Sequence, residues 1–208
     1  MSNIANFDYD WINNNTSHHR YLINTILKFL NQIDTYKIDH LDVGCGNGFL
    51  TNRFHEKFNS SLGVDLSDEG IRQAKQYENT KLKFRNIELE KLIEENKSFD
   101  LVSAFEVIEH QYLPDTFLKK INALLKINGY LLLSTPYHGY FKNLAISLLN
   151  KHDWHFNPLW RHGHIKFFSI KTLSKVLSET SFEIINYKFS GRIYPFSSSM
   201  VFLCKKIN

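Results

Sequence analysis

The feature that most constrains this chain is a glycine-rich turn directly after a short apolar strand. Residues 41–48 read Leu-Asp-Val-Gly-Cys-Gly-Asn-Gly, and Ile38–Val43 is apolar enough for a buried strand. Apolar residues then recur at helical spacing: Phe49, Leu50, Phe54 and Phe58. Glycines at such a turn let the backbone approach a ligand, and the first N–H groups of the helix are unpaired. The motif predicts a strand–turn–helix unit that binds a small molecule, the alternative being a tight turn without a ligand.

An acidic residue at the end of the next predicted strand indicates which class of ligand the turn binds. Asp65 ends a second predicted strand over residues 61–64, where an acid can accept both hydroxyls of a ribose. A dehydrogenase motif needs a further glycine at the position of Phe49, and Asp42 would repel a pyrophosphate. A carboxylate at Asp42 suits the ammonium group of an amino acid instead. Adenosine joined to an amino acid is S-adenosylmethionine.

The order of the predicted elements gives the fold class. Strands and helices alternate from Ile38 to Ser134, which is typical of a parallel sheet with helices on both faces. After a helix over Ile170–Thr180, the strands Phe182–Phe189 and Met200–Cys204 are joined too closely for a parallel crossover. The sequence predicts an α/β fold with a seven-stranded, mostly parallel, doubly wound sheet and an antiparallel last strand. The other predicted elements are helices over 17–33, 67–77 and 114–125, and strands over 81–85, 99–105 and 130–134.

Length and composition bound the domain count and the partners. The chain has 208 residues, 43% of them hydrophobic and 22% charged, which is ordinary for a globular protein. We expect one domain over 1–208, with an N-terminal helical segment (1–36) and an insertion or lid over the active site (137–168). The net charge of +4 without a long basic run makes nucleic acid an unlikely partner. Two cysteines form no disulfide framework, and no signal peptide or membrane span is visible, so a cytoplasmic location is expected.

A second group of ionisable side chains follows the fourth predicted strand. Residues 106–110 read Glu-Val-Ile-Glu-His, and in a helix Glu106, Glu109 and His110 share one face. Two carboxylates and an imidazole at the carboxyl edge of a sheet can bind a divalent cation. The alternatives are a solvated acidic helix start with His110 packing or capping, or His110 acting alone as a general base.

These motifs resemble those of the class I S-adenosylmethionine-dependent methyltransferases. The similarity rests on residues 42–48, 64–66, 99–102 and 128–132, which span most of the chain. The resemblance implies that Gly44 and Gly46 lie under the methionine part and that Asp65 holds the ribose. It places Asn86 beside adenine, where the family usually has Asp. The full set of cofactor residues that it implies is Arg20, Asp42, Gly44, Gly46, Asp65, Leu66, Asn86, Ile87 and Phe105.

Residues 106–110 resemble the same run in two branches of this fold, the ubiquinone-pathway O-methyltransferases and the small-RNA 3′-end 2′-O-methyltransferases. In the second branch, two acids and a His, with a distant His, hold Mg²⁺ against neighbouring hydroxyls. Residues 163–169 are similar to the segment that brings the distant His, with His138 as an alternative source. The resemblance therefore implies Mg²⁺ or another divalent metal on Glu106, Glu109, His110 and His164.

The sequence predicts a methyltransferase that methylates an oxygen of a small molecule with two adjacent hydroxyls, such as a catechol or a sugar. Glu109 and His110 are the predicted catalytic residues, and a metal on both oxygens would lower the hydroxyl pKa. Two alternatives are 2′-O-methylation at an RNA 3′ end and a catalytically silent, adenosyl-binding regulatory subunit. Apolar residues over 141–149, between Lys142 and Lys151, leave contact with a membrane or a lipid open, against a lid packed on its own domain.

Overall fold

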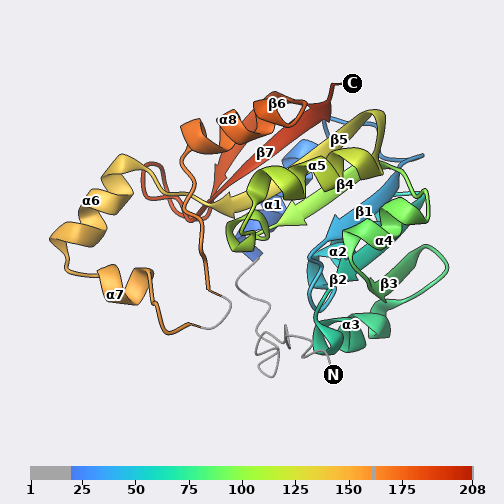
Figure 1. The fold of residues 1–208 in the computed structure, drawn as a ribbon, viewed down its shortest axis with the longest axis horizontal. Coiled ribbons are helices and arrows are strands. Elements are labelled where there is room, and N and C mark those ends of the chain that lie inside the picture. The colour runs from blue at the N-terminus through green and yellow to red at the C-terminus, as the bar shows by residue number, and fades with distance from the viewer. Residues whose placement is uncertain (1–19, 161–162, 208) are drawn as a thin grey trace.

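The structure, a computed structural model, describes residues 20–160 and 163–207. Its strands are β1 (Asp39–Val43), β2 (Ser60–Asp65), β3 (Leu82–Asn86), β4 (Phe99–Phe105), β5 (Leu125–Pro136), β6 (Phe182–Ser190) and β7 (Ser199–Lys206). They form one seven-stranded sheet in the order β3-β2-β1-β4-β5-β7-β6 (Figure 1). The pairs from β3 to β5 are parallel, and β7 is antiparallel to both of its neighbours. The predicted fold class is confirmed.

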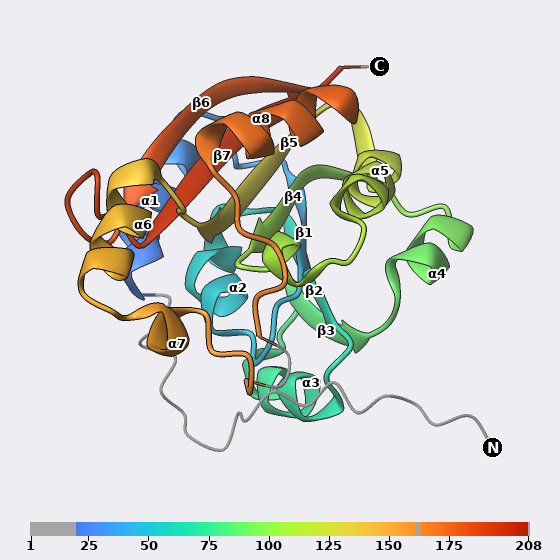
Figure 2. The same cartoon turned by 60° about the vertical axis from the view of Figure 1, so that its left-hand side comes forward.

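Helices cover both faces of this sheet (Figure 2). They are α1 (Arg20–Leu30), α2 (Phe49–Phe54), α3 (Asp68–Ala74), α4 (Leu89–Glu94), α5 (Pro114–Leu124), α6 (Tyr140–Leu148), α7 (His152–His155) and α8 (Ile170–Glu179). Helices α1 and α2 share a core cluster with Leu101 and Phe105 of β4. Helices α4, α5 and α8 share another with Val102 and Ala104. Successive strand residues point to opposite faces, so β4 is buried on both sides and is almost entirely apolar.

Several element ends differ from the sequence prediction. Helix α1 ends at Leu30 rather than Ile33, and the predicted residues 17–19 lie outside the described ranges. The turn expected at Asn128-Gly129 lies within β5, as an irregularity with Asn128 at a φ of 64°. Helix α4 was not predicted, because it is only six residues long and buries only Leu89 and Leu92, which is too few apolar positions for a recognisable helical pattern. Serine residues cap the N-termini of α3 and α8. In α3 the Ser67 hydroxyl accepts from the Gly70 N–H, which confirms the predicted N-cap.

The insertion over residues 137–168 leaves the sheet after β5 and returns before α8. It carries α6 and α7, which Figure 1 shows extending away from the sheet, and neither helix has a buried residue. The base of the insertion is closed by the His138 N–H, which donates to the Phe168 carbonyl at 3.0 Å. The Lys142 ammonium of α6 donates to the Ser197 carbonyl at 3.3 Å, and a lid packed on its own domain stays a prediction. None of the described helices is long and apolar enough to cross a membrane. A single domain over 1–208 stays a prediction.

Candidate active site

The predicted site residues gather at the carboxyl ends of three neighbouring strands. The glycine turn follows β1, Asp65 ends β2, and residues 106–110 follow β4. Strand β1 lies between β2 and β4, and the strand order reverses there. Open parallel sheets bind ligands in the crevice outside such a reversal. The topology therefore brings the two sequence motifs to one edge of the sheet.

The glycine turn lies close against strand β2 and against the loop after β4. Gly44 has a φ of 71°, and a Cβ there would lie 2.5 Å from Cγ2 of Val107 in the loop after β4. The N–H groups of Gly44 and Cys45 both donate to the Val64 carbonyl, at 2.8 and 3.1 Å. Only glycine adopts this conformation without strain and leaves room for Val107. Sequence reasoning missed Val107, which had no chemical signal of its own.

Asp65 is held in place by the loops around it. Its Oδ2 accepts the Gly46 N–H at 2.8 Å, and its Oδ1 accepts the Ser67 N–H at 2.9 Å. Burial raises the pKa of Asp65, while the backbone N–H groups oppose that rise. Each carboxylate oxygen keeps a second lone pair, so both can accept a ribose hydroxyl. The neighbouring Leu66 is 42% exposed beside it.

Asn86 and Ile87 lie at the end of β3, where adenine contacts were predicted. The Asn86 amide nitrogen donates to the Asp68 carboxylate at 2.7 Å and to the Leu66 carbonyl at 3.2 Å. Because the amide nitrogen is directed at Asp68, the amide oxygen of Asn86 points away from Asp68, where it can accept from an adenine amino group. Ile87 is buried beside it, and an open hollow lined by Asp68, Asn86 and Ile71 adjoins them. Asp68, which fixes the Asn86 amide, was missed by sequence reasoning.

Two of the predicted cofactor residues face the core beneath the turn. Phe105 is 7% exposed and packs in the α1–α2 core cluster, and its contact with the cofactor stays a prediction. Asp42 is 3% exposed, and its carboxylate accepts the Thr51 hydroxyl at 2.5 Å and the Ser103 hydroxyl at 2.6 Å. Contact of Asp42 with an ammonium group stays a prediction. So does the cofactor contact of Arg20, which is exposed at the first residue of α1.

Glu106 departs from the predicted helix. Its φ of 57° lies in the left-handed region, and the only helical turn in this run is a 3₁₀ turn, η4, over Ile108–His110. The Glu106 carboxylate accepts the Ser134 hydroxyl at 2.7 Å and the Ser199 hydroxyl at 3.0 Å. Burial raises the pKa of Glu106 to about 7. The prediction that Glu106 shares a helical face with Glu109 and His110 is therefore wrong.

Glu109, His110 and His164 do come together. Each offers one ligand atom, and these atoms lie within 4.8 Å of one another; we refer to them as the Glu-His-His group. The Glu109 side chain is fully buried, and its Oε2 accepts the Thr135 hydroxyl at 3.0 Å. Its Oε1 has no hydrogen-bond partner among the described residues and lies 3.9 Å from Nε2 of His164. Burial, with Glu106 nearby, raises the pKa of Glu109.

Backbone hydrogen bonds bring His164 to this group. The N–H groups of Ile165 and Lys166 both donate to the Glu109 carbonyl, at 3.0 and 2.9 Å. The His110 Nδ1 lies 3.2 Å from the Gly163 carbonyl, which can only accept, so Nδ1 carries a hydrogen. Burial lowers the pKa of His164 to about 4, which keeps its ring neutral at pH 7.

The structure also separates the two histidines that were open as the distant ligand. His138 is buried in the insertion, where its ring lies 5.0 Å from that of Phe167 and 5.5 Å from that of His155. It is not a member of the Glu-His-His group, which contains His164 as predicted. Of the four predicted metal ligands, the structure thus brings together three.

Comparison with known proteins identifies the family of this chain. A family model described as a methyltransferase domain matches residues 16–187. The chain is 30% identical over 165 residues to the human mitochondrial ubiquinone biosynthesis O-methyltransferase, covering 76% of this chain and 44% of that protein. It is 28% identical over 160 residues to the ubiquinone biosynthesis O-methyltransferase of Coxiella burnetii, covering 74% of this chain and 68% of that protein. The chain thus spans less than half the length of the human relative.

Solved structures show the same fold. Magnesium protoporphyrin IX methyltransferase from Synechocystis, with bound S-adenosylhomocysteine, superposes with a TM-score of 0.70 at 17% identity, covering 91% of this chain and 84% of that one. An S-adenosylmethionine-dependent methyltransferase from Mesorhizobium loti gives a TM-score of 0.66 at 17% identity, covering 86% and 96%. With the match to the family model, these findings establish that the chain belongs to the methyltransferase-domain family and has the class I fold of S-adenosylmethionine-dependent methyltransferases.

Proposed function

We propose that this protein transfers the methyl group of S-adenosylmethionine to an oxygen of a small molecule that carries two adjacent oxygens, with help from a divalent metal. The observation that carries the proposal is the Glu-His-His group, which lies after β4 at the same sheet edge as the glycine turn. The names of the ubiquinone-pathway relatives support methyl transfer to oxygen. A catechol-like or sugar diol matches a site that can hold a metal against two oxygens.

The cofactor would bind across the ends of β1, β2 and β3. The turn after β1 allows close approach to the backbone, and Asp65 is oriented to accept the ribose hydroxyls. The amide oxygen of Asn86 is turned away from Asp68 and can accept from adenine. Asp42 would receive the ammonium group from below the turn. In this proposal, the methyl group would face the loop after β4.

The donor atoms of the Glu-His-His group fit a divalent cation. A buried carboxylate oxygen without a hydrogen-bond partner is costly, and a bound cation would stabilise the ionised form of Glu109. Two imidazoles and one carboxylate favour Mn²⁺, Zn²⁺ or Co²⁺ over Mg²⁺ in binding strength. Three protein ligands leave room for two substrate oxygens. When bound, such a cation lowers the pKa of an acceptor hydroxyl and orients it.

The protein's own residues would prepare the displacement. The Gly163 carbonyl fixes the His110 ring, so that its Nε2 can bind a metal or take a proton from the acceptor. The Thr135 hydroxyl fixes one Glu109 oxygen, which aims the other at the histidines. Methyl transfer from a sulfonium is an in-line displacement, so these groups act chiefly by positioning the acceptor oxygen.

Two measurements test this proposal. Calorimetry should show binding of S-adenosylhomocysteine and none of a nicotinamide dinucleotide; the reverse result would overturn the cofactor assignment. A purified sample given a deuterated methyl donor and a cell extract should label a small molecule, identified by mass spectrometry. If that labelling survives excess EDTA, the metal part of the proposal is wrong and His110 remains as the base.

The alternatives predict different results. An RNA 3′-end methyltransferase would bind oligoribonucleotides with a steep salt dependence. The net charge of only +4 gives little support for such binding. A silent adenosyl-binding subunit would bind S-adenosylhomocysteine and transfer no methyl group to any extract component.

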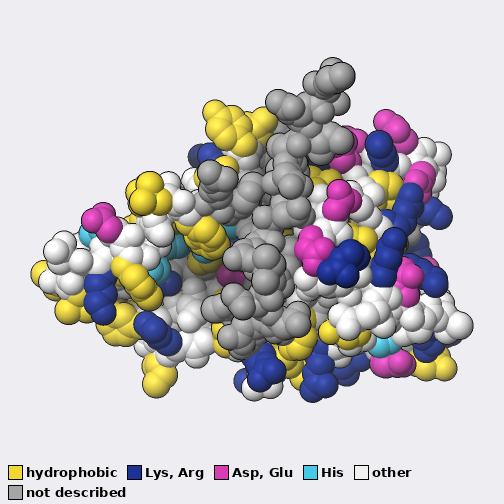
Figure 3. All heavy atoms as spheres, turned by 90° about the horizontal axis from the view of Figure 1, so that it is seen from below, with side chains coloured by type: hydrophobic (Ala, Val, Ile, Leu, Met, Phe, Trp, Pro, Cys, Tyr) yellow, Lys and Arg dark blue, Asp and Glu magenta, His cyan; other side chains and the backbone are white. Residues whose placement is uncertain are grey.

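The insertion supports one further part of the proposal, contact with an anionic membrane surface. Tyr140, Leu148 and Trp154 are 74–77% exposed, and Lys151 and Arg192 are exposed as well. Figure 3 shows hydrophobic and basic side chains intermixed at this end of the molecule. Such a mixture is typical of surfaces that dock on anionic lipid.

Cosedimentation with phosphatidylglycerol vesicles tests the membrane contact. We expect binding to these vesicles and little to neutral phosphatidylcholine vesicles, with the binding lost in a Leu148→Asp/Trp154→Asp double variant. Tyr36→Asp, at an 81% exposed position outside the insertion, is the matched control. Equal binding by the double variant and by Tyr36→Asp would reject the contact.

A further inference from the structure

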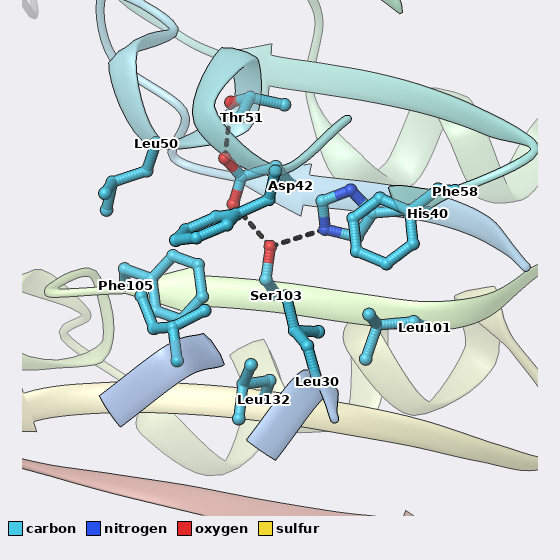
Figure 4. Close-up of a pocket in the computed structure, with 12 residues that line it drawn as sticks. Leu30, His40, Asp42, Leu50, Thr51, Phe58, Leu101, Ser103, Phe105 and Leu132 are labelled. Carbon is cyan, nitrogen blue, oxygen red and sulfur yellow. Dashed lines mark hydrogen bonds between the residues drawn. The ribbon is translucent and has the colours of Figure 1, made fainter. Parts of the chain in front are cut away.

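A chain of hydrogen-bonded polar side chains crosses the apolar core between the sheet and the helices α1 and α2. It consists of Ser61, His40, Ser103, Asp42 and Thr51, all of which are at most 4% exposed. Figure 4 shows His40, Ser103, Asp42 and Thr51 joined in this order among apolar side chains. The adjoining cavity measures about 10 Å³, room for one water molecule at most. The members of the chain must therefore satisfy one another.

The strand register produces this alignment. His40 pairs with Ser61 on β2, and Asp42 pairs with Ser103 on β4. His40 and Asp42 are two positions apart on β1, so their side chains point to the same face of the sheet. Thr51 completes the chain from the first turns of α2, which follows the glycine turn.

The direction of each hydrogen bond follows from chemistry. An ionised Asp42 can only accept, so Ser103 gives its single hydroxyl hydrogen to Oδ1 at 2.6 Å. Ser103 must then accept from Nε2 of His40, at 2.8 Å. A neutral His40 has one N–H, so its Nδ1 accepts from the Ser61 hydroxyl at 3.3 Å. Burial lowers the pKa of His40 to about 3, which keeps it neutral at physiological pH.

We propose that His40 is a positioning residue for cofactor binding, which acts through Ser103 to keep Asp42 ionised and fixed beneath the glycine turn, where its charge would attract the ammonium group of the cofactor. The inference rests on the proposed function, in which Asp42 receives that ammonium group. A hydroxyl that accepts from an N–H donates more strongly in turn. The bonds of 2.5 and 2.6 Å to Asp42 have the length of hydroxyl–carboxylate hydrogen bonds.

The Asp42 carboxylate is sensitive to the loss of a donor. Burial raises its pKa to about 6, Asp65 acts in the same direction, and the hydroxyls of Ser103 and Thr51 oppose the rise. The titratable groups that face Asp42 are Asp65 at the end of β2, Cys45 in the turn, and His40 itself. A weaker Ser103 donor therefore moves the pKa of Asp42 toward neutrality. As the pH falls, such a variant then loses affinity for the cofactor at a higher pH than the parent does.

Calorimetry with S-adenosylhomocysteine at pH 6 and pH 8 tests the inference. A rise of one unit in the Asp42 pKa weakens binding by about fivefold at pH 6 and hardly at all at pH 8. We expect this pattern for His40→Leu, which removes the donor. We expect near-parental binding for His40→Gln, whose amide nitrogen can replace Nε2. Equal weakening of His40→Leu at both pH values, or no weakening, would overturn the inference.

A second measurement needs no cofactor. In ¹⁵N and ¹³C NMR spectra of the unliganded protein, we expect His40 as the neutral Nε2–H tautomer from pH 5 to pH 8. The Asp42 carboxyl carbon should titrate at a higher pH in His40→Leu than in the parent. An Nδ1–H tautomer, or an unchanged Asp42 titration, would overturn the inference. A protein that binds no S-adenosylhomocysteine would refute the proposed function, and the NMR titration would still decide whether His40 acts on Asp42.

Discussion

Nε2 of His164 lies 3.9 Å from Oε1 of Glu109, although the two residues come from separate parts of the chain. The Glu109 oxygen is fully buried and has no hydrogen-bond partner among the described residues. A buried carboxylate oxygen directed at two histidines is an arrangement that a cation stabilises. This pair is therefore the most direct place to test the chemistry.

The first prediction concerns Glu109→Gln, which keeps the shape of the side chain and removes its charge. We expect Mn²⁺ affinity, measured by calorimetry, to fall by about 10- to 100-fold, with methyl transfer falling in parallel. Glu90→Gln is the matched control, because Glu90 pairs with Lys120 on the surface, far from the group in sequence. Full activity of Glu109→Gln would rule out the metal mechanism.

The second prediction concerns Asp65→Ala. The change removes the acceptor for the ribose and for the N–H groups of Gly46 and Ser67. Loss of two hydrogen bonds to a charged acceptor should weaken binding of S-adenosylhomocysteine by roughly 100-fold or more. Asp115→Ala, which breaks an exposed pair with Lys119, should bind as the parent does. Parental affinity in Asp65→Ala would place the ribose elsewhere.

The third prediction concerns Gly44→Ala and its neighbour Val107. A methyl group at Gly44 meets the Val107 side chain, and the φ of 71° strains any residue with a Cβ. We expect Gly44→Ala to lower the thermal midpoint and cofactor affinity, and Val107→Ala to restore part of both. The part that remains is the backbone strain, about 1–2 kcal/mol. No rescue by Val107→Ala would mean that the close approach is not the cause.

The fourth prediction concerns the pH dependence of folding stability. His40 has a pKa of about 3 in the folded protein and about 6.5 when unfolded. Below pH 6.5 the unfolded chain binds a proton that the folded chain does not, so stability is lost as the pH falls. His40→Leu removes this loss. Relative to the parent, its free energy of unfolding should therefore rise by roughly 2 kcal/mol from pH 7 to pH 5.

Urea unfolding at several pH values measures this difference. His40→Gln measures this loss alone, since glutamine does not titrate and keeps the donor to Ser103, whereas His40→Leu also raises the pKa of Asp42 and should gain more stability as the pH falls. Parallel stability curves for the parent and both variants would contradict the burial of a neutral histidine. The comparison is independent of the cofactor.

Much of the fold could be predicted from local patterns. The glycine turn, the acid at the end of the next strand and the short connection before β7 each follow from chain geometry, and the structure has all three. His164 was correctly placed with Glu109 and His110 because residues 163–169 resemble a known ligand segment. These are features in which a few neighbouring residues determine the outcome.

The errors arose where tertiary packing decides. Glu106 has a left-handed conformation, with its carboxylate held by serines on β5 and β7, and no pattern near residue 106 shows that those serines lie beside it. Leu101 and Phe105 lie an even number of residues apart on β4, so strand alternation puts both on the face toward the α1–α2 core. The polar Ser103 between them was the available signal for the hydrogen-bond chain to Asp42.

The backbone hydrogen bonds at the base of the insertion fix the position of His164 independently of the outer helices α6 and α7. The bond from His138 to Phe168 joins the two ends of the insertion, and the bonds from Ile165 and Lys166 to Glu109 tie its second end to the loop after β4. His164 is held by the second of these ties, whereas α6 and α7 lie beyond both. The outer helices can thus be exchanged or resized without moving His164. A descendant of this chain could change its acceptor while keeping its chemistry.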